Sequence, residues 1–165
     1  MAIDYTIYRS SRKDRIECDV FCDGKSIHKV YLKRGTSSPA YIDIDRIHLV
    51  SEYDVEQTLI PGVTKREVIY RDHDIKFCSI QWNHDQSYTV SFHDEAINIV
   101  RLDSESFAFR KDKKNIAVIT RFKEKRDNLK LDYEYEPIYT VKCEEEISDQ
   151  VLITIFSFPI LYFGF

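Results

Sequence analysis

A run of basic residues is the stretch of this sequence whose charge could recognise a ligand. From Arg110 to Arg126 the chain holds eight basic and two acidic residues, a local balance of +6 against −4 for the whole chain. Such asymmetry indicates a partner, and each cation near an anionic membrane surface contributes about 1 kcal/mol of attraction. The candidate lipid-binding residues are Arg110, Lys111, Lys113, Lys114, Arg121 and Lys123.

The same run has a second interpretation as a solvated surface. Lysines at turns and strand edges discourage pairing between the edges of neighbouring molecules. A site for nucleic acid would place exposed aromatic side chains among the cations. Phe107, Phe109 and Phe122 flank the run, and their spacing is expected to put them on an inward strand face. Nucleic acid is therefore not an expected partner.

Histidine and aspartate are adjacent at three places where general acid–base chemistry could arise, namely Asp72-His73-Asp74, His84-Asp85 and His93-Asp94. All three lie in expected turns, where both residue types are common for conformational reasons. Asp43-Ile44-Asp45 offers two carboxylates to a hard cation but no third ligand, and no glycine-rich phosphate loop is present. We expect a non-catalytic protein with no cofactor and no metal.

The four cysteines are expected to be thiols. Cys18 and Cys22 fall on one face of a strand, while Cys78 and Cys143 are isolated. A zinc site would need close Cys or His pairs at two places. The first residues lack the basic and apolar pattern of a secretory signal, so we expect a cytoplasmic protein in a reducing compartment, with a peripheral membrane location as an option.

Short strands must position these residues. The chain holds 11 Tyr and 10 Phe but only 4 Gly, and aromatic enrichment favours strands. In Arg15–Cys22 the apolar residues recur with period two, and Asp23-Gly24 then predicts a hairpin turn. The expected strands are 5–9, 15–22, 27–32, 41–49, 53–60, 66–70, 75–82, 87–92, 96–102, 106–110, 115–122, 129–135 and 138–143.

The last stretch of the sequence, from Val151 to Phe165, carries no charge. Ser148 is suited to cap a helix and Asp149 to its first turn, whereas Pro159 should end or kink it, so we predict a core helix over 148–158. The apolar run would measure about 22 Å as a helix, less than the roughly 30 Å of a bilayer core. No transmembrane span is expected, and residues 160–165 are compatible with staying in the core or emerging from it.

The number of strands predicts the architecture. About a dozen strands in one open sheet would curl or split, and closure into a barrel removes the exposed edges. Because barrel diameter grows with strand number, the lumen of such a barrel needs filling, which a helix apolar on every side can do. We predict one mainly β domain over 1–165, an antiparallel barrel of about twelve strands with the hydrophobic C-terminal helix in its lumen.

The order of the late elements resembles a known family. A strand at Asn115–Phe122, another at Tyr139–Cys143, and Ser148-Asp149-Gln150 leading into Val151–Phe156 are similar to the tubby C-terminal-like superfamily, which includes LURP-one-related proteins, phospholipid scramblases and small bacterial members. The resemblance spans most of the chain and rests on pattern and order. It implies a twelve-stranded barrel around a hydrophobic C-terminal helix.

The resemblance also implies a function. It suggests a non-catalytic module that binds anionic phospholipid headgroups through the basic run. The alternative is a protein that docks to a protein partner or to a membrane through its apolar tail. The chain departs from the family in carrying Pro159 and then Ile160–Phe165, where a family helix would already have stopped.

Overall fold

The computed structural model describes residues 2–11, 15–33, 41–44, 47–57, 64–72, 75–83, 85, 87–123, 137–144 and 146–161. These residues form twelve strands and one helix, so the prediction of a mainly β chain with a C-terminal helix is confirmed. The elements are β1 (Ala2–Ser11), β2 (Arg15–Cys22), β3 (Lys25–Lys33), β4 (Tyr41–Ile44), β5 (Ile47–Gln57), β6 (Thr64–Asp72), β7 (Ile75–Trp82), β8 (Tyr88–Ser91), β9 (Ala96–Asp103), β10 (Ser106–Lys111), β11 (Lys114–Lys123), β12 (Pro137–Glu144) and α1 (Asp149–Leu161).

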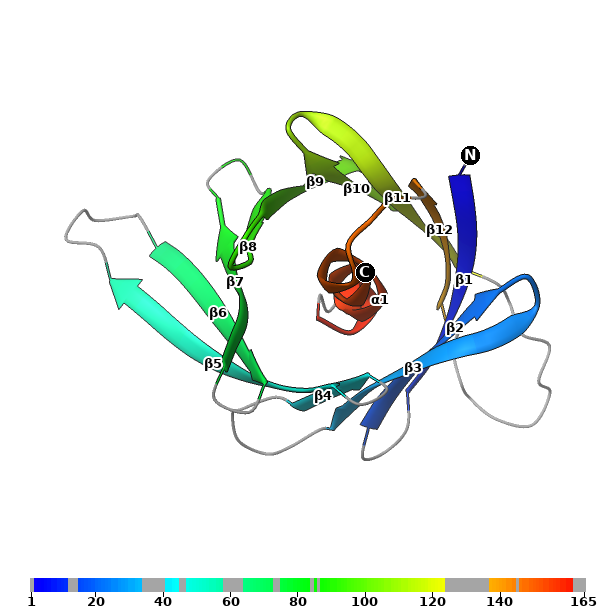
Figure 1. The fold of residues 1–165 in the computed structure, drawn as a ribbon, viewed down its shortest axis with the longest axis horizontal. Helices are drawn as coiled ribbons and strands as arrows, with labels where there is room; N and C mark the ends of the chain where they lie inside the picture. Colours follow the sequence, from blue (N-terminus) through cyan, green and yellow to red (C-terminus); the bar gives the residue numbers. More distant parts are fainter. Residues whose placement is uncertain are drawn as a thin grey trace.

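Each strand pairs antiparallel with the strands before and after it in sequence. The first strand also pairs with the last, with Ala2 opposite Glu144 and Tyr8 opposite Ile138. The ladder thereby returns on itself as a closed barrel, and Figure 1 shows the strands as a ring around α1. Because the ring is closed, each of the twelve strands has a hydrogen-bonded neighbour on both sides, which removes the exposed edges of an open sheet.

Period-two alternation decides which side chains face the lumen. Tyr5 and Ile7 of β1 are buried, and their Cα partners include Val141 of β12 and Val20 of β2, which are also buried. Successive residues of a strand point to opposite faces. The buried members of neighbouring strands therefore form a continuous apolar lining.

One expected strand is in fact two. The run 41–49 is divided between β4 and β5, which pair with each other so that Asp43 lies opposite His48. β5 then continues to Gln57 through the predicted break before Tyr53. Both faces of this run mix charged and apolar residues, so alternation gave no sign of the reversal. The expected strand at 129–135 lies outside the described residues.

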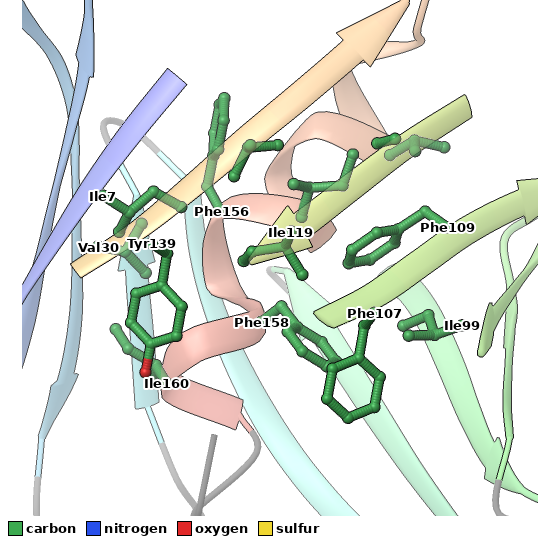
Figure 2. Close-up of a cluster of buried hydrophobic side chains, with 14 of the residues drawn as sticks. Ile7, Val30, Ile99, Phe107, Phe109, Ile119, Tyr139, Phe156, Phe158 and Ile160 are labelled. Carbon is green, nitrogen blue, oxygen red and sulfur yellow. The ribbon is translucent and has the colours of Figure 1, made fainter. Parts of the chain in front are cut away.

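The helix α1 packs its aromatic side chains against the barrel lining. The Phe156 ring lies 5.1 Å from that of Tyr5 and 5.5 Å from that of His28. Phe158 contacts Phe107 and Phe109 of β10, with ring centroids 5.0 and 5.4 Å apart, as Figure 2 shows. Both helix phenylalanines are buried, as are Val151, Ile155 and Ile160.

The helix runs further than the sequence predicts. Pro159 lies inside α1, which ends at Leu161, so the prediction that Pro159 ends the helix near residue 158 is wrong. Proline removes the helical hydrogen bond that its own amide would have donated. The Pro159 carbonyl oxygen, in the last turn of the helix, accepts a hydrogen bond from Nη1 of Arg9 at 3.0 Å. No helix of the described part of the chain has the length and hydropathy needed to cross a bilayer.

All four cysteines are free, and Cys18, Cys78 and Cys143 are buried. Burial raises the pKa of each of these three thiols to about 12. The thiolate is the nucleophile and the metal ligand, so these side chains stay protonated and unreactive at neutral pH. Within the described ranges, no three His, Cys, Asp or Glu side chains are grouped closely enough to hold a metal ion.

Candidate functional site

The hairpin of β10 and β11 divides the six predicted lipid-binding residues between two ends of the barrel. Lys111 and Lys114 are partners across the hairpin, and Arg110 and Lys113 lie beside them. Arg121 lies near the other end of β11, opposite Tyr139. Lys123 ends β11, but its side chain lies outside the described part. The six residues therefore do not form one patch.

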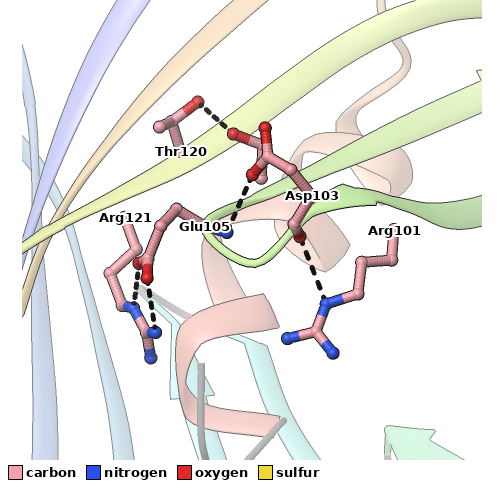
Figure 3. A network of polar contacts seen from close by, with 6 residues as sticks. Arg101, Asp103, Glu105, Thr120 and Arg121 are labelled. Atoms are coloured by element: carbon pink, nitrogen blue, oxygen red, sulfur yellow. Dashed lines mark hydrogen bonds and ion pairs between the residues drawn. The ribbon is translucent and has the colours of Figure 1, made fainter.

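Carboxylates from other segments neutralise three of these cations. Nζ of Lys111 lies 2.8 Å from Glu95, and that of Lys114 lies 3.2 Å from Glu144. Nε of Arg121 lies 2.8 Å from Oε2 of Glu105, as Figure 3 shows. The Arg121 side chain is only 14% exposed. Arg121 is therefore enclosed, whereas the Lys111 and Lys114 side chains are 44% and 71% exposed, and a ligand there would have to compete with the paired carboxylate.

Arg110 and Lys113 instead line a pocket on the outer wall of the barrel. The pocket is open to solvent, has a volume of about 530 Å³, and is lined by Asn83, Asp85, Ser87, Asn98, Val100, Arg110 and Lys113. Phe107 and Phe109 of β10 contact the lumen helix, so Arg110, the next residue, is directed outward. We call this the outer pocket, and it brings together two of the six predicted residues.

Hydrogen bonds hold the polar lining of the outer pocket in place. Nδ2 of Asn83 donates to Oγ1 of Thr89 at 2.9 Å, and that hydroxyl donates to Oδ1 of Asn98 at 3.1 Å. Nε of Arg110 donates to Oδ1 of Asn115 at 2.7 Å. Because that bond uses Nε, it orients the guanidinium group without using its two terminal nitrogens. A guanidinium group oriented in this way suits an oxyanion.

Lys113 is held in an unusual backbone conformation. Its φ is 66° and that of the preceding Asp112 is 51°, which is the left-handed pair of a two-residue type I′ hairpin turn. Residues with a Cβ pay about 1–2 kcal/mol in this region, and glycine or asparagine is the usual choice. A lysine therefore occupies a position where the turn alone would favour glycine.

Lys113→Gly should raise the free energy of unfolding by about 1 kcal/mol, because glycine adopts positive φ without the steric cost. Urea denaturation followed by circular dichroism measures the change. Lys113→Ala is the matched control, since it removes the same charged side chain but keeps the Cβ. Equal stability of the two variants would contradict the interpretation of a strained turn.

The structure gives the other candidate residues no common site. His93 is exposed, and the carboxylate of Asp94 accepts a hydrogen bond from Nε2 of Gln150 at 2.7 Å. His73, Asp74, His84 and Asp45 lie outside the described residues.

Phe107 and Phe109 face inward as predicted, but Phe122 is 48% exposed. On β11 the odd-numbered Ala117 and Ile119 take the inward positions, so the inward prediction is wrong for Phe122.

Sequence reasoning missed the uncharged part of the outer pocket. Asn83 and Ser87 flank the β7–β8 turn, and Asn98 lies on β9 opposite Arg110. The only available signal was that Thr89 and Asn98 alternate with apolar residues and so face outward. That signal is shared by any solvated strand face.

No protein-family model, curated protein or solved structure matches this chain.

Proposed function

We propose that this chain is a tubby-like, non-catalytic domain that binds the anionic headgroup of a membrane phospholipid in the outer pocket. The observation that carries the proposal is the convergence of Arg110 and Lys113 on one pocket, whose remaining lining is two amides, one hydroxyl, Val100 and a single carboxylate, that of Asp85. A guanidinium group and an ammonium group are the usual partners of phosphate oxygens. Of the other cations of the basic run, Lys111, Lys114 and Arg121 are bonded to carboxylates.

The fold supports the tubby-like part of this proposal. Twelve sequential antiparallel strands followed by one apolar helix are the order that the resemblance implies. We propose that α1 serves as the permanent filling of the barrel lumen. The burial of Ile155, Phe156 and Phe158 favours this role over a tail that docks into a membrane or a protein partner, because docking would expose them.

The proposed site of action is the cytoplasmic membrane surface, with the protein bound peripherally. The net charge of −4 opposes attraction of the whole molecule to an anionic membrane, so binding must depend on a local site. Screening by salt weakens such exposed contacts, with a Debye length near 8 Å at physiological ionic strength. A headgroup site of this kind therefore predicts binding that falls as salt is raised.

Vesicle flotation tests the proposal. We expect the wild-type chain to float with phosphatidylserine or phosphoinositide vesicles and not with phosphatidylcholine alone, and to release as salt is raised. Lys113→Glu changes the charge by two units and should weaken binding by about 2 kcal/mol, or roughly thirtyfold, since each unit contributes about 1 kcal/mol. Lys111→Glu is avoided because Lys111 bonds to Glu95.

Lys142→Glu provides the charge-matched control. Lys142 is an exposed residue of β12 opposite Val118, and it does not line the outer pocket. Its reversal changes the net charge as much as that of Lys113 does. Equal loss of binding in the two variants would show that the overall charge of the protein, and not the outer pocket, accounts for vesicle binding. Equal flotation with neutral and anionic vesicles would refute the lipid proposal.

A further inference from the structure

Glu95 is the centre of a polar cluster where α1 begins. Its carboxylate accepts hydrogen bonds from Ser148 Oγ at 2.5 Å and from Gln150 Nε2 and Lys111 Nζ, both at 2.8 Å. Gln150 also donates to Asp94. We call these five residues the Glu95 cluster. It joins three segments that are distant in sequence, namely the β8–β9 turn, the tip of the β10–β11 hairpin and the first turn of α1.

The hydrogen bonds of the Glu95 cluster favour the ionised carboxylate. The hydrogen bond from Lys111, followed by those from Ser148 and Gln150, lowers the pKa of Glu95 to about 2, so the carboxylate is ionised at neutral pH. A carboxylate is also favourable at the N-terminus of a helix, where the backbone dipole is positive. The Ser148 carbonyl oxygen accepts the first helical bond, from the amide of Leu152 at 3.0 Å.

The hairpin tip presents its side chains to two faces of the barrel wall. Arg110 and Lys113 line the outer pocket, while Lys111, between them in sequence, bonds to Glu95 beside the start of α1. The turn that connects these residues is the short left-handed Asp112–Lys113 pair. Arg110 is held by its pairing with Asn98 and Asn115, whereas Lys113 lies in the turn itself, two residues from Lys111, so the anchoring of Lys111 bears on where Lys113 lies.

We propose that the Glu95 cluster couples the outer pocket to the N-terminal turn of α1, so that the pocket is complete only while the helix is in place. This inference rests on the proposed function and names its regulation. Loss of the cluster frees the hairpin tip and lets Lys113 move away from Arg110. Because coupling between two sites is reciprocal, a headgroup bound to the pocket also holds the first turn of α1 in place.

The direction in which Glu95→Gln changes the affinity for anionic vesicles separates coupling from simple electrostatics. Glu95→Gln and Glu144→Gln each remove one carboxylate that pairs with a hairpin lysine, Lys111 or Lys114. Electrostatics alone predicts tighter binding of anionic vesicles by both variants. Coupling predicts about fivefold weaker binding for Glu95→Gln, a typical coupling strength, and binding at least as tight as wild type for Glu144→Gln.

Ser148→Ala is a milder second variant. It removes one hydrogen bond to Glu95 without changing charge, and it should weaken binding about twofold to threefold while the far-ultraviolet circular dichroism stays that of the wild type. Should Glu95→Gln fail to fold, Ser148→Ala still decides the question. The proposal is overturned if Ser148→Ala and Glu95→Gln bind phosphatidylserine vesicles as tightly as wild type or more tightly.

Amide hydrogen exchange measures the reverse effect, that of a headgroup bound in the outer pocket on the first turn of α1. In the wild-type chain, phosphatidylserine vesicles should slow exchange in the peptide covering residues 149–155, whereas phosphatidylcholine vesicles should not. In Ser148→Ala the slowing should be smaller. Bound vesicles that leave exchange of this peptide unchanged would refute the coupling and leave the lipid-binding proposal intact. Absence of binding to anionic vesicles would refute both.

Discussion

Phe158→Ala should destabilise the fold by about 3–5 kcal/mol, the range for removing a buried phenylalanine ring. The side chain is fully buried, and its ring contacts those of Phe107 and Phe109 between the helix and β10. Domains of this kind are stable by about 5–15 kcal/mol, so the loss is a large share of the total. Urea denaturation followed by circular dichroism measures it.

Phe122→Ala is the matched control for this prediction. Phe122 lies on β11, next to β10, but is 48% exposed, so its removal opens no cavity. Its effect should stay within about 0.5 kcal/mol, as for most surface substitutions. Similar effects of the two substitutions would contradict a structural role of α1 in the barrel core.

Arg9→Met should destabilise the protein by about 2 kcal/mol, the scale for leaving a buried polar group without its partner. Nη1 of Arg9 donates to the Pro159 carbonyl oxygen near the C-terminus of α1, where a cation also meets the negative end of the helix dipole. Arg9 also hydrogen-bonds the side chain of Tyr139, whose pKa is raised to about 12, mainly by burial. The buried Nε of Arg9 has no partner in the described residues, which limits the loss.

Arg15→Met is the matched control for Arg9→Met. Arg15 pairs with Glu17 on the outside of β2, and its side chain is 41% exposed. Exposed ion pairs contribute about 0–1 kcal/mol, so the midpoint of urea denaturation should move little. A loss in Arg9→Met no larger than that in Arg15→Met would show that the contact with Pro159 does not stabilise α1.

Much of the strand pattern could be predicted because local alternation carries it. Ile16, Cys18 and Val20 recur with period two and are all buried in β2. The prediction of a single strand over 41–49 was wrong because apolar residues appear on both faces of this run. Period-two alternation therefore cannot distinguish one strand from a hairpin there. Pro159 was misread because a proline can kink a helix without ending it. Phe158 and Ile160, on either side of it, are buried, and that burial depends on strands distant in sequence.

The candidate site was predictable only in part, for a related reason. The sequence indicated a basic run, but the charge of a run says nothing about the carboxylates that meet it in the fold. Glu95, Glu105 and Glu144 come from the β8–β9 turn, the β9–β10 turn and β12, and they neutralise Lys111, Arg121 and Lys114. Among the cations whose side chains the structure describes in this run, Arg110 and Lys113 are the two that line a pocket, and the amides beside them carry no sequence signal.

The pairing of β1 with β12 has a consequence for synthesis of the chain. Ala2 cannot meet Glu144 until both strands have left the ribosome, and translation at about 5–20 residues per second makes β1 wait for seconds. During that time the apolar inner faces of the earlier strands have neither their last neighbour nor α1 to cover them. Such long-range pairing is also slow to form. The nascent chain therefore exposes apolar strand faces until the ring closes.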